Sequence, residues 1–321
     1  MLDFTFYNPA RVIFGRTALD ALGDMLGKYG ASRVLLHYGG GSIKRSGIYE
    51  KIVRILEERG IAYVELGGVQ PNPRISLVRE GIGLCREAGV DFVLAVGGGS
   101  VIDSAKGIAA GVKYPGDIWE CYINYRRITD ALPIGVVLTV VGAGSETSPG
   151  TVITDEATGF KRYTGGECLI PKFAILNPEF TNSVPAYQTA CGAADILAHL
   201  LERYFTPERN VDLTDRLLEG AMKTVLYQAP IAVKSPTDYH ARAELMWAGT
   251  LAHNNLLGTG RLGDWASHDI GHELSAFYDL PHGATLSIIF PAWMRYVHRA
   301  NLDRFVQLAV RVFGVDLAFE D

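Results

Sequence analysis

The sequence predicts an α/β domain followed by an all-α domain. The first half alternates short apolar runs of β type with amphipathic helical stretches, while long helical patterns with few strand signals dominate the second half. A chain of 321 residues is also long enough to form two domains. We therefore expect domains over 1–183 and 184–321, with the boundary where the pattern changes.

The order of elements in the first half indicates a parallel, doubly wound sheet, because strands that alternate with helices pair in parallel. The strands are expected at 33–38, 62–66, 91–96 and 133–139, and two of the helices at 48–58 and 75–87. In the second half, helices are expected over 188–204, 213–228, 241–257 and 303–312.

Composition and charge give no reason to expect nucleic acid or a membrane as a partner. The net charge is −5 and basic residues are scattered, whereas proteins that bind polyanions concentrate basic residues. No apolar run is long enough to cross a bilayer, and the N-terminus lacks the pattern of a signal peptide. The 4 cysteines are widely spaced without a Cys-x-x-Cys motif, so we expect reduced thiols in a cytoplasmic protein.

Acidic and histidine side chains in the second half form a candidate metal site. Asp195 and His199 stand four residues apart, which puts both on one face of a helix. His268 and His272 repeat this spacing, and His282 follows soon after. A carboxylate with imidazoles suits a divalent metal such as Fe(II) or Zn(II). Because histidines also serve as surface or buried hydrogen-bonding residues, the spacing alone leaves open which of them bind metal.

A glycine-rich turn follows the strand expected at 91–96 and opens a helix. Glycines let the backbone approach a phosphate, and a helix N-terminus favours negative charge, so Gly98, Gly99 and Ser100 are candidates to bind a nucleotide. Asp103 lies near the helix start, where it either contacts the cofactor or caps the helix. The chain has no Gly-x-Gly-x-x-Gly fingerprint after the first strand and no P-loop, which disfavours a standard Rossmann dehydrogenase and a P-loop NTPase.

An earlier glycine turn bears on the choice of dinucleotide. Gly40 and Gly41 are followed by Ser42, Lys44 and Arg45, and no Asp or Glu stands in this segment. An acidic residue there would bind the ribose hydroxyls of NAD(H), whereas a 2′-phosphate needs positive charge. We therefore expect NADP(H) to be preferred over NAD(H), although a basic surface turn explains the same pattern equally well.

Taken together, these motifs resemble the iron-containing (group III) alcohol dehydrogenases, and within them an NADPH-dependent, butanol-dehydrogenase-like branch. The resemblance runs from about residue 3 to the end of the chain. It implies the fold shared with dehydroquinate synthase, in which a dinucleotide-binding α/β domain and an all-α domain enclose the active site. The matching segments are 38–44, 71–74, 96–106, 194–202, 268–278 and 281–283.

The resemblance also implies roles for single residues. Asp195, His199, His268 and His282 match the metal ligands of the family. His272 matches a further, non-ligating histidine near the substrate and the nicotinamide.

On the nucleotide side, the turn at 98–100 resembles the family's pyrophosphate cradle, and Lys161 resembles a lysine that approaches the ribose. Family members commonly form homodimers, often through edge strands of the N-terminal segment. The resemblance therefore implies a homodimer, with 4–7 and 11–14 as the candidate strands.

Two of the departures from the family bear on the candidate site. In the third glycine-rich stretch, which begins at Thr139 and is a further candidate cofactor contact, Ala143 stands where the family usually has threonine. The sequence ends at Asp321, whereas relatives continue through more C-terminal helices, so we expect a truncated C-terminus and a substrate pocket that lacks part of its wall.

The function expected from the resemblance is the reversible oxidation of a primary alcohol, butanol-like, to an aldehyde with NAD(P)H. Three alternatives remain: a glycerol dehydrogenase, a lyase similar to dehydroquinate synthase, and an inactive remnant that binds metal and nucleotide. The lyase would need several basic residues for an anionic substrate, and the stretch 254–264 offers only Arg261.

Overall fold

The computed structural model describes residues 1–316. The α/β domain contains a six-stranded sheet in the order β1-β8-β5-β4-β2-β3. All its neighbouring strands pair in parallel, which confirms the predicted doubly wound sheet. Its strands are β1 (Arg11–Phe14), β2 (Arg33–Gly39), β3 (Ala62–Val69), β4 (Phe92–Gly97), β5 (Ile134–Leu138) and β8 (Phe173–Leu176).

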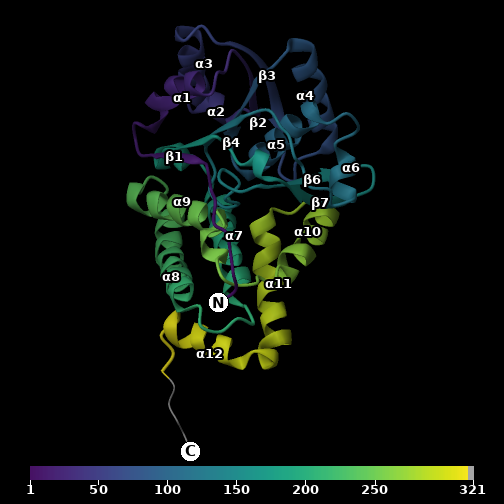
Figure 1. Cartoon of the computed structure of the whole chain (residues 1–321). Coiled ribbons are helices and arrows are strands. Elements are labelled where there is room, and N and C mark those ends of the chain that lie inside the picture. The colour runs from purple at the N-terminus through teal and green to yellow at the C-terminus, as the bar shows by residue number, and fades with distance from the viewer. Residues whose placement is uncertain (317–321) are drawn as a thin grey trace, which may run out of the picture.

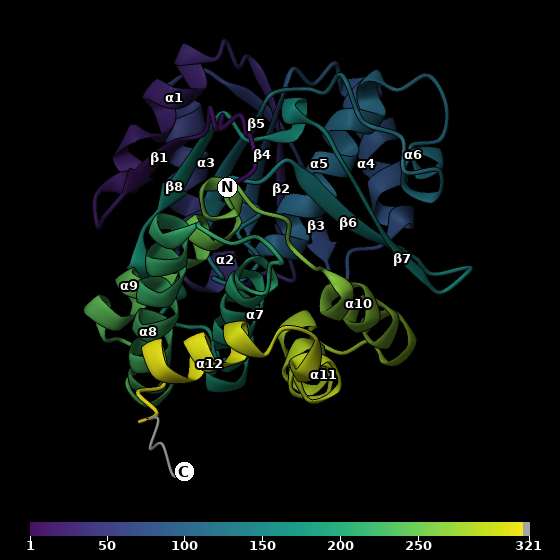
Figure 2. The ribbon, with the colours of Figure 1, turned by 60° about the horizontal axis from the view of Figure 1, so that its bottom comes forward.

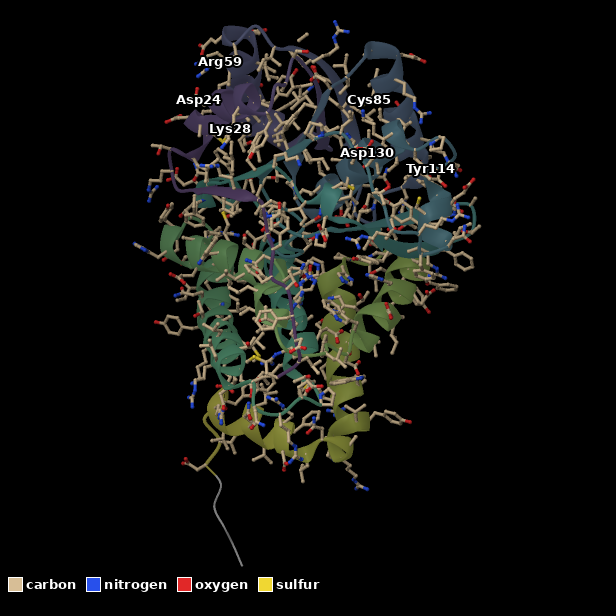
Figure 3. All side chains as sticks on the ribbon, viewed as in Figure 1. Asp24, Lys28, Arg59, Cys85, Tyr114 and Asp130 are labelled. Carbon is tan, nitrogen blue, oxygen red and sulfur yellow. The ribbon has the colours of Figure 1, made fainter. Side chains whose placement is uncertain are left out.

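Helices cover both faces of this sheet (Figures 1 and 2). They are α1 (Leu22–Lys28), α2 (Ser42–Arg45), α3 (Ile48–Glu58), α4 (Ile75–Ala88), α5 (Gly99–Lys113) and α6 (Trp119–Ile123). Successive side chains of a strand point to opposite faces. Val34 and Leu36 of β2 therefore pack with α1 and α3, whereas Leu35 packs with α4 and α5. On the outer surface, Arg59 after α3 meets Asp24 of α1 at 2.5 Å (Figure 3).

A separate hairpin reaches from the sheet toward the helical domain. Strands β6 (Gly150–Asp155) and β7 (Phe160–Gly165) pair in antiparallel fashion. On one side β6 packs against α5, and on the other β7 packs against α10 (Ala266–Tyr278). Lys161 therefore stands on a strand that contacts both domains.

The helical domain lies below the sheet in Figure 1. Besides α10 it comprises α7 (Ala186–Tyr204), α8 (Asp212–Lys234), α9 (Tyr239–His253), α11 (His282–Val297) and α12 (Leu302–Arg311). The helix predicted over 213–228 continues through Pro230 to the end of α8. The helix predicted over 241–257 ends earlier, because Asn255 has a left-handed backbone with φ 72. No helix within residues 1–316 is long and apolar enough to cross a membrane.

The candidate edge strand over 4–7 has no neighbouring strand within the single chain, where residues 1–10 contain no strand. This segment makes isolated hydrogen bonds to the helical domain instead of a ladder with another strand. The Leu2 amide donates to the Gly260 carbonyl, and Asn8 donates to the Asn254 carbonyl. The second predicted strand, 11–14, is β1, which pairs in parallel with β8 at the edge of the sheet.

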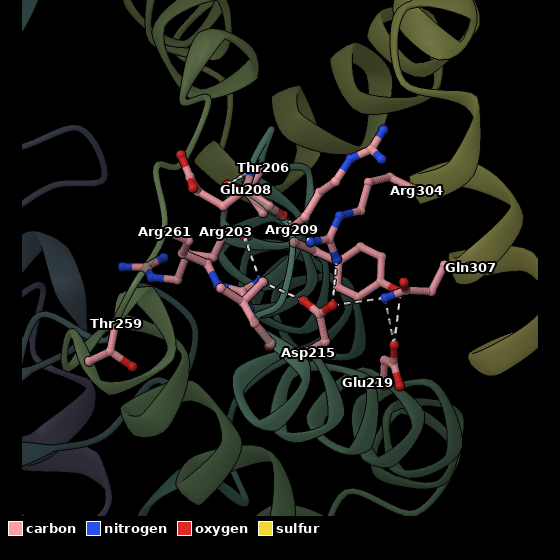
Figure 4. A network of polar contacts seen from close by, with 12 residues as sticks. Arg203, Thr206, Glu208, Arg209, Asp215, Glu219, Thr259, Arg261, Arg304 and Gln307 are labelled. Carbon is pink, nitrogen blue, oxygen red and sulfur yellow. Dashed lines mark hydrogen bonds and ion pairs between the residues drawn. The ribbon is translucent and has the colours of Figure 1, made fainter. Parts of the chain in front are cut away.

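A buried polar network fixes α12 against α8 (Figure 4). Asp215 of α8 meets Arg304 at 2.5 Å and Arg261 at 2.9 Å, and all three residues are buried. Gln307 donates to the same carboxylate at 3.0 Å and to Glu219 at 3.1 Å. The Asp215 charge thus compensates two guanidinium groups in a region of low dielectric constant.

We predict that Asp215→Asn destabilises the protein strongly. The substitution leaves two buried guanidinium groups with little compensating charge, so the free energy of unfolding should fall by about 3–5 kcal/mol. Urea unfolding followed by circular dichroism measures this loss.

Asp303→Asn is the matched control. Asp303 meets Arg209 at 4.0 Å, and the two side chains are 90% and 88% exposed. Because water screens such a pair, the free energy of unfolding should change by less than about 0.5 kcal/mol. If both variants lowered the free energy of unfolding equally, the buried network would stabilise the protein no more than the exposed ion pair does.

Candidate functional site

A cavity of about 930 Å³ lies between the two domains. One wall is the carboxyl edge of the sheet, where Gly39 ends β2, Gly97 ends β4 and Thr139 follows β5. Strands β3 and β4 lie on opposite sides of β2, so the cavity opens where the strand order reverses, the usual ligand position in such sheets. The predicted site residues that line it are Ser42, Gly98, Gly99, Ser100, Asp103, Thr139, Lys161, Asp195, His199, His268, His272 and His282.

Three of the four predicted metal ligands converge on the helical wall. One ligand atom from each of Asp195, His268 and His282 lies within 4.8 Å of the other two. They come from α7, α10 and the first residue of α11. His199, one turn after Asp195, lies beside this group, with its Nδ1 3.8 Å from Asp195 Oδ1 and its ring centroid 4.8 Å from that of His268.

These four residues fit a divalent metal ion. Each has a buried polar atom without a hydrogen-bond partner among the described residues, namely Asp195 Oδ1, His199 Nδ1, His268 Nε2 and His282 Nδ1. An unsatisfied buried polar atom costs about 1–3 kcal/mol, so four in one place call for a shared partner. A carboxylate with imidazoles is a donor set that Fe(II) and Zn(II) accept.

Burial shifts the pKa of several side chains on the helical wall. It lowers the pKa of His199, His272 and His282 well below the ordinary value for histidine. It also raises the pKa of Asp195 to about 6. Neutral imidazole is the form that binds a metal, and a cation at this place would favour the ionised carboxylate.

Glu202 holds His268 in place, although the sequence analysis did not single it out. Its Oε1 accepts from His268 Nδ1 at 2.7 Å and from the His268 amide at 3.0 Å, and its Oε2 accepts from the Trp265 amide at 2.6 Å. Nε2 is therefore the free nitrogen of His268, and a carboxylate behind a ligating histidine fixes its tautomer and orientation. The signal that could have found Glu202 is its place seven residues after Asp195, on the same face of α7.

Another histidine, His253, also lines the cavity and was missed. Its ring centroid lies 4.3 Å from that of His199. The buried Arg203 contacts His253 Nδ1 at 3.2 Å and donates to the His199 carbonyl at 2.9 Å. His253 has no second candidate ligand four residues away on its helix, so the sequence offered no reason to single it out.

The glycine turn after β4 forms part of the opposite wall. Gly98 precedes α5, and Gly99 and Ser100 are its first residues. A Cβ on Gly98 would come within 2.7 Å of Val140, and one on Gly99 within 2.6 Å of Ala143, so the turn has no room for larger residues. The free backbone N–H groups at the start of this 15-residue helix suit a pyrophosphate.

Asp103 helps to fix the loop after β5. Its Oδ2 accepts from the Val152 amide at 3.0 Å, and its Oδ1 accepts from the Ser145 hydroxyl at 2.5 Å. The buried Lys106 donates to the carbonyls of Ser145 at 2.7 Å and Ser148 at 2.8 Å. The Asp-x-x-Lys spacing therefore positions the loop next to the glycine turn, while Asp103 also borders the cavity.

Lys161 links the two walls. Its Nζ donates to Asn72 Oδ1 at 3.0 Å, and Asn72 Nδ2 donates to Asp279 Oδ1 at 3.0 Å. Arg74 meets the same oxygen at 2.9 Å. Burial lowers the pKa of Lys161 to about 8. These contacts hold the turn between α10 and α11, directly before His282, against the α/β domain.

The first glycine turn reaches the cavity only in part. Among the described residues, Ser42 and Arg45 line it, whereas Gly40, Gly41 and Lys44 do not. Lys44 instead forms an ion pair away from the cavity. Of the two cations on which the expected preference for NADP(H) was based, only Arg45 therefore borders the cavity.

The sheet, the helical domain and the cavity between them are those of an NAD(P)-dependent oxidoreductase. Residues 9–178 match the family described as "Iron-containing alcohol dehydrogenase", and residues 189–320 match "Fe-containing alcohol dehydrogenase family, C-terminal". The chain belongs to the iron-containing alcohol dehydrogenases, which confirms the resemblance seen in the motifs.

Individual relatives agree with this assignment. A "Probable NADH-dependent butanol dehydrogenase 2" of Bacillus subtilis is 47% identical over 316 residues, which cover 98% of this chain and 81% of the relative. The "NADPH-dependent aldehyde reductase YqhD" of Escherichia coli is 37% identical, with 100% and 83% covered. The structure of an NADH-dependent butanol dehydrogenase A of Thermotoga maritima superimposes with a TM-score of 0.97 at 42% identity, covering 100% of this chain and 80% of that one. Use of NAD(P)H is thus supported, but a preference for NADP(H) is not.

We predict that Glu202→Gln weakens metal binding. The variant removes the negative charge behind His268, so the affinity for Zn(II) or Fe(II) should fall about 10- to 100-fold. Competition with a chelator, read out as bound metal by mass spectrometry, measures this affinity.

Glu87→Gln, on the exposed face of α4, is the matched control and should bind metal like the unchanged protein. His268→Ala should retain no metal after dialysis. Unchanged metal content in His268→Ala would refute the ligand assignment.

Proposed function

We propose that this chain interconverts short primary alcohols, butanol-like, and their aldehydes by hydride transfer with NAD(P)H. The observation that carries the proposal is one cavity whose helical wall holds the Asp195, His268 and His282 group and whose opposite wall holds the glycine turn after β4. Hydride transfer needs a substrate carbon and a nicotinamide held side by side, and such a cavity provides for both. The names of the butanol dehydrogenases and the aldehyde reductase support the substrate class.

In this proposal Asp195, His199, His268 and His282 hold the metal, Fe(II) or Zn(II). When bound, the metal supplies a Lewis acid for the alcohol or carbonyl oxygen. His272 lines the cavity, and its ring centroid lies 5.0 Å from that of His282. We assign it to hold the substrate and to move a proton at the substrate oxygen, because its neutral imidazole can donate or accept.

On the opposite wall, the turn at 98–100 holds the pyrophosphate and Lys161 the ribose, with Asp103 and Thr139 as further contacts. When bound, the nicotinamide supplies or accepts the hydride. The donors for this task are the free N–H groups at the start of α5 and the buried ammonium group of Lys161.

A preference for NADP(H) over NAD(H) stays a prediction from Ser42, Lys44 and Arg45 in the turn that begins with the glycines 40 and 41. Relatives of both kinds are similar to this chain, and those at 45–47% identity are named as NADH-dependent. The balance between the two dinucleotides is therefore the part of the proposal that most needs measurement.

A homodimer and a cytoplasmic location are further parts of the proposal. The exposed side chains of Phe4, Phe6 and Tyr7, next to the open edge of β1, support association through the N-terminal segment. The free thiols of the 4 cysteines support a reducing compartment. Light scattering in solution tests the dimer.

Metal removal tests the function directly. Protein stripped by a chelator should not oxidise NADPH or NADH in the presence of butanal, and protein reloaded with Fe(II) or Zn(II) should do so. Steady-state absorbance of the nicotinamide measures the rate. If neither metal with either dinucleotide gives turnover, the oxidoreductase proposal fails and the inactive remnant is the better description.

We predict that His272→Ala lowers kcat by about 100-fold or more, the usual contribution of a group that moves a proton. Bound metal should remain unchanged, because His272 is not assigned as a ligand. Steady-state kinetics with butanal, together with metal analysis, measures both. His240→Ala, an exposed histidine on α9, is the control that should leave kcat and metal unchanged. Loss of metal in His272→Ala would show that the ligand set is wrong.

A further inference from the structure

Lys44 belongs to the turn that borders the cavity, yet its side chain is held outside. It lies on the short helix α2 with Ser42 and Arg45, both of which line the cavity. Its Nζ is 3.5 Å from Glu65 Oε2. The ammonium also lies over the rings of two tyrosines, at 5.1 Å and 4.4 Å from their centroids.

Glu65 is the centre of this contact. It stands on β3, beside the strand that leads into the turn, where it pairs with Leu36. The Tyr38 hydroxyl donates to Oε2 at 2.7 Å, and the Tyr49 hydroxyl donates to Oε1. Partial burial raises the pKa of Glu65, but the hydrogen bonds of the two tyrosines and the charge of Lys44 outweigh it and keep that pKa below its usual value. Glu65 is thus an ionised carboxylate whose two oxygens are both engaged.

Charge beside the adenosine ribose discriminates between two chemically distinct ligands. NADP(H) carries a 2′-phosphate on the adenosine ribose, and NAD(H) carries a hydroxyl. A nearby cation raises the affinity for a phosphate and a nearby carboxylate lowers it, whereas the uncharged hydroxyl gains little from a cation. Arg45 forms no ion pair among the described residues, and Lys44 with Glu65 adds no net charge.

We propose that Glu65 is a specificity-determining residue for the dinucleotide, because it draws Lys44 away from the cavity and neutralises it. The 2′-phosphate then meets Arg45 and Ser42 but not Lys44, so the preference for NADP(H) over NAD(H) is weaker than it would be if both cations faced the cavity. This inference rests on the proposed function, since it requires a dinucleotide in the cavity with its adenosine end at the first glycine turn.

Glu65→Gln tests the proposal. Glutamine keeps one oxygen that accepts from a tyrosine hydroxyl, and its amide group can donate to the oxygen of the other tyrosine, but it has no charge to hold Lys44. The affinity for 2′-phospho-ADP-ribose relative to ADP-ribose should rise about 10-fold, measured by calorimetry with the metal-loaded protein. Adding Lys44→Met to this variant should remove the gain. Glu57→Gln, on the exposed face of α3, changes the net charge equally and should leave the ratio unchanged.

A second pair of variants does not depend on the folding of Glu65→Gln. In the otherwise unchanged protein, Arg45→Met should lower the affinity for 2′-phospho-ADP-ribose about 10-fold, whereas Lys44→Met should change it less than about 2-fold. Equal losses in these two variants, or an unchanged ratio in Glu65→Gln, would overturn the role of Glu65 while leaving the proposed function intact. If neither nucleotide binds the unchanged protein, the inference and the proposed function fail together.

Discussion

The candidate site depends on one constraint, which is that α7 buries polar side chains along one face. Asp195, His199, Glu202 and Arg203 follow one another at helical spacing, and all are buried. A buried polar group needs a partner, and α7 supplies few of them itself, such as the His199 carbonyl that accepts from Arg203. Partners therefore come from α9, α10 and α11, so the packing of the helical domain around the cavity is set by polar as well as apolar contacts.

On the opposite wall of the cavity the constraint acts on the backbone, which must pass close to the loop that follows β5. Gly98 and Gly99 leave no room for a Cβ next to the loop that follows β5. That loop is in turn held by Lys106, whose ammonium binds its carbonyls. The helical wall thus presents polar side chains, and the opposite wall presents backbone N–H groups. The first suits a polar reacting centre, and the second suits a pyrophosphate.

Local sequence patterns predicted many of these helices and strands. They could not predict features that depend on contacts between distant parts of the chain. The helix over 48–58 agrees with α3 at both ends, since apolar residues at helical spacing report the buried face directly. The hairpin of β6 and β7 was not predicted, because its strands are short and partly polar. The edge strand over 4–7 was predicted but has no neighbouring strand in the single chain.

Residues brought in by tertiary contacts were the harder part of the site. No acidic residue lies in the first glycine turn along the chain, but Glu65 reaches that turn from the neighbouring strand of the sheet. His253 reaches the histidine group in a similar way, from the end of a different helix. Spacing along the chain can predict that Asp195 and His199 lie side by side. It cannot predict contacts between residues that are distant in the sequence.

The hydrogen bonds from Lys161 to Asn72 and from Asn72 to Asp279 connect the two walls of the cavity. A ligand that drew Lys161 away from Asn72 would disturb the hydrogen bond that Asn72 donates to Asp279, directly before the helix that begins with His282. By linkage, if a ligand on one wall changes the affinity for a ligand on the other wall, the second ligand changes the affinity for the first by the same factor. Occupancy on the sheet side and occupancy on the helical side would therefore be coupled through three side chains.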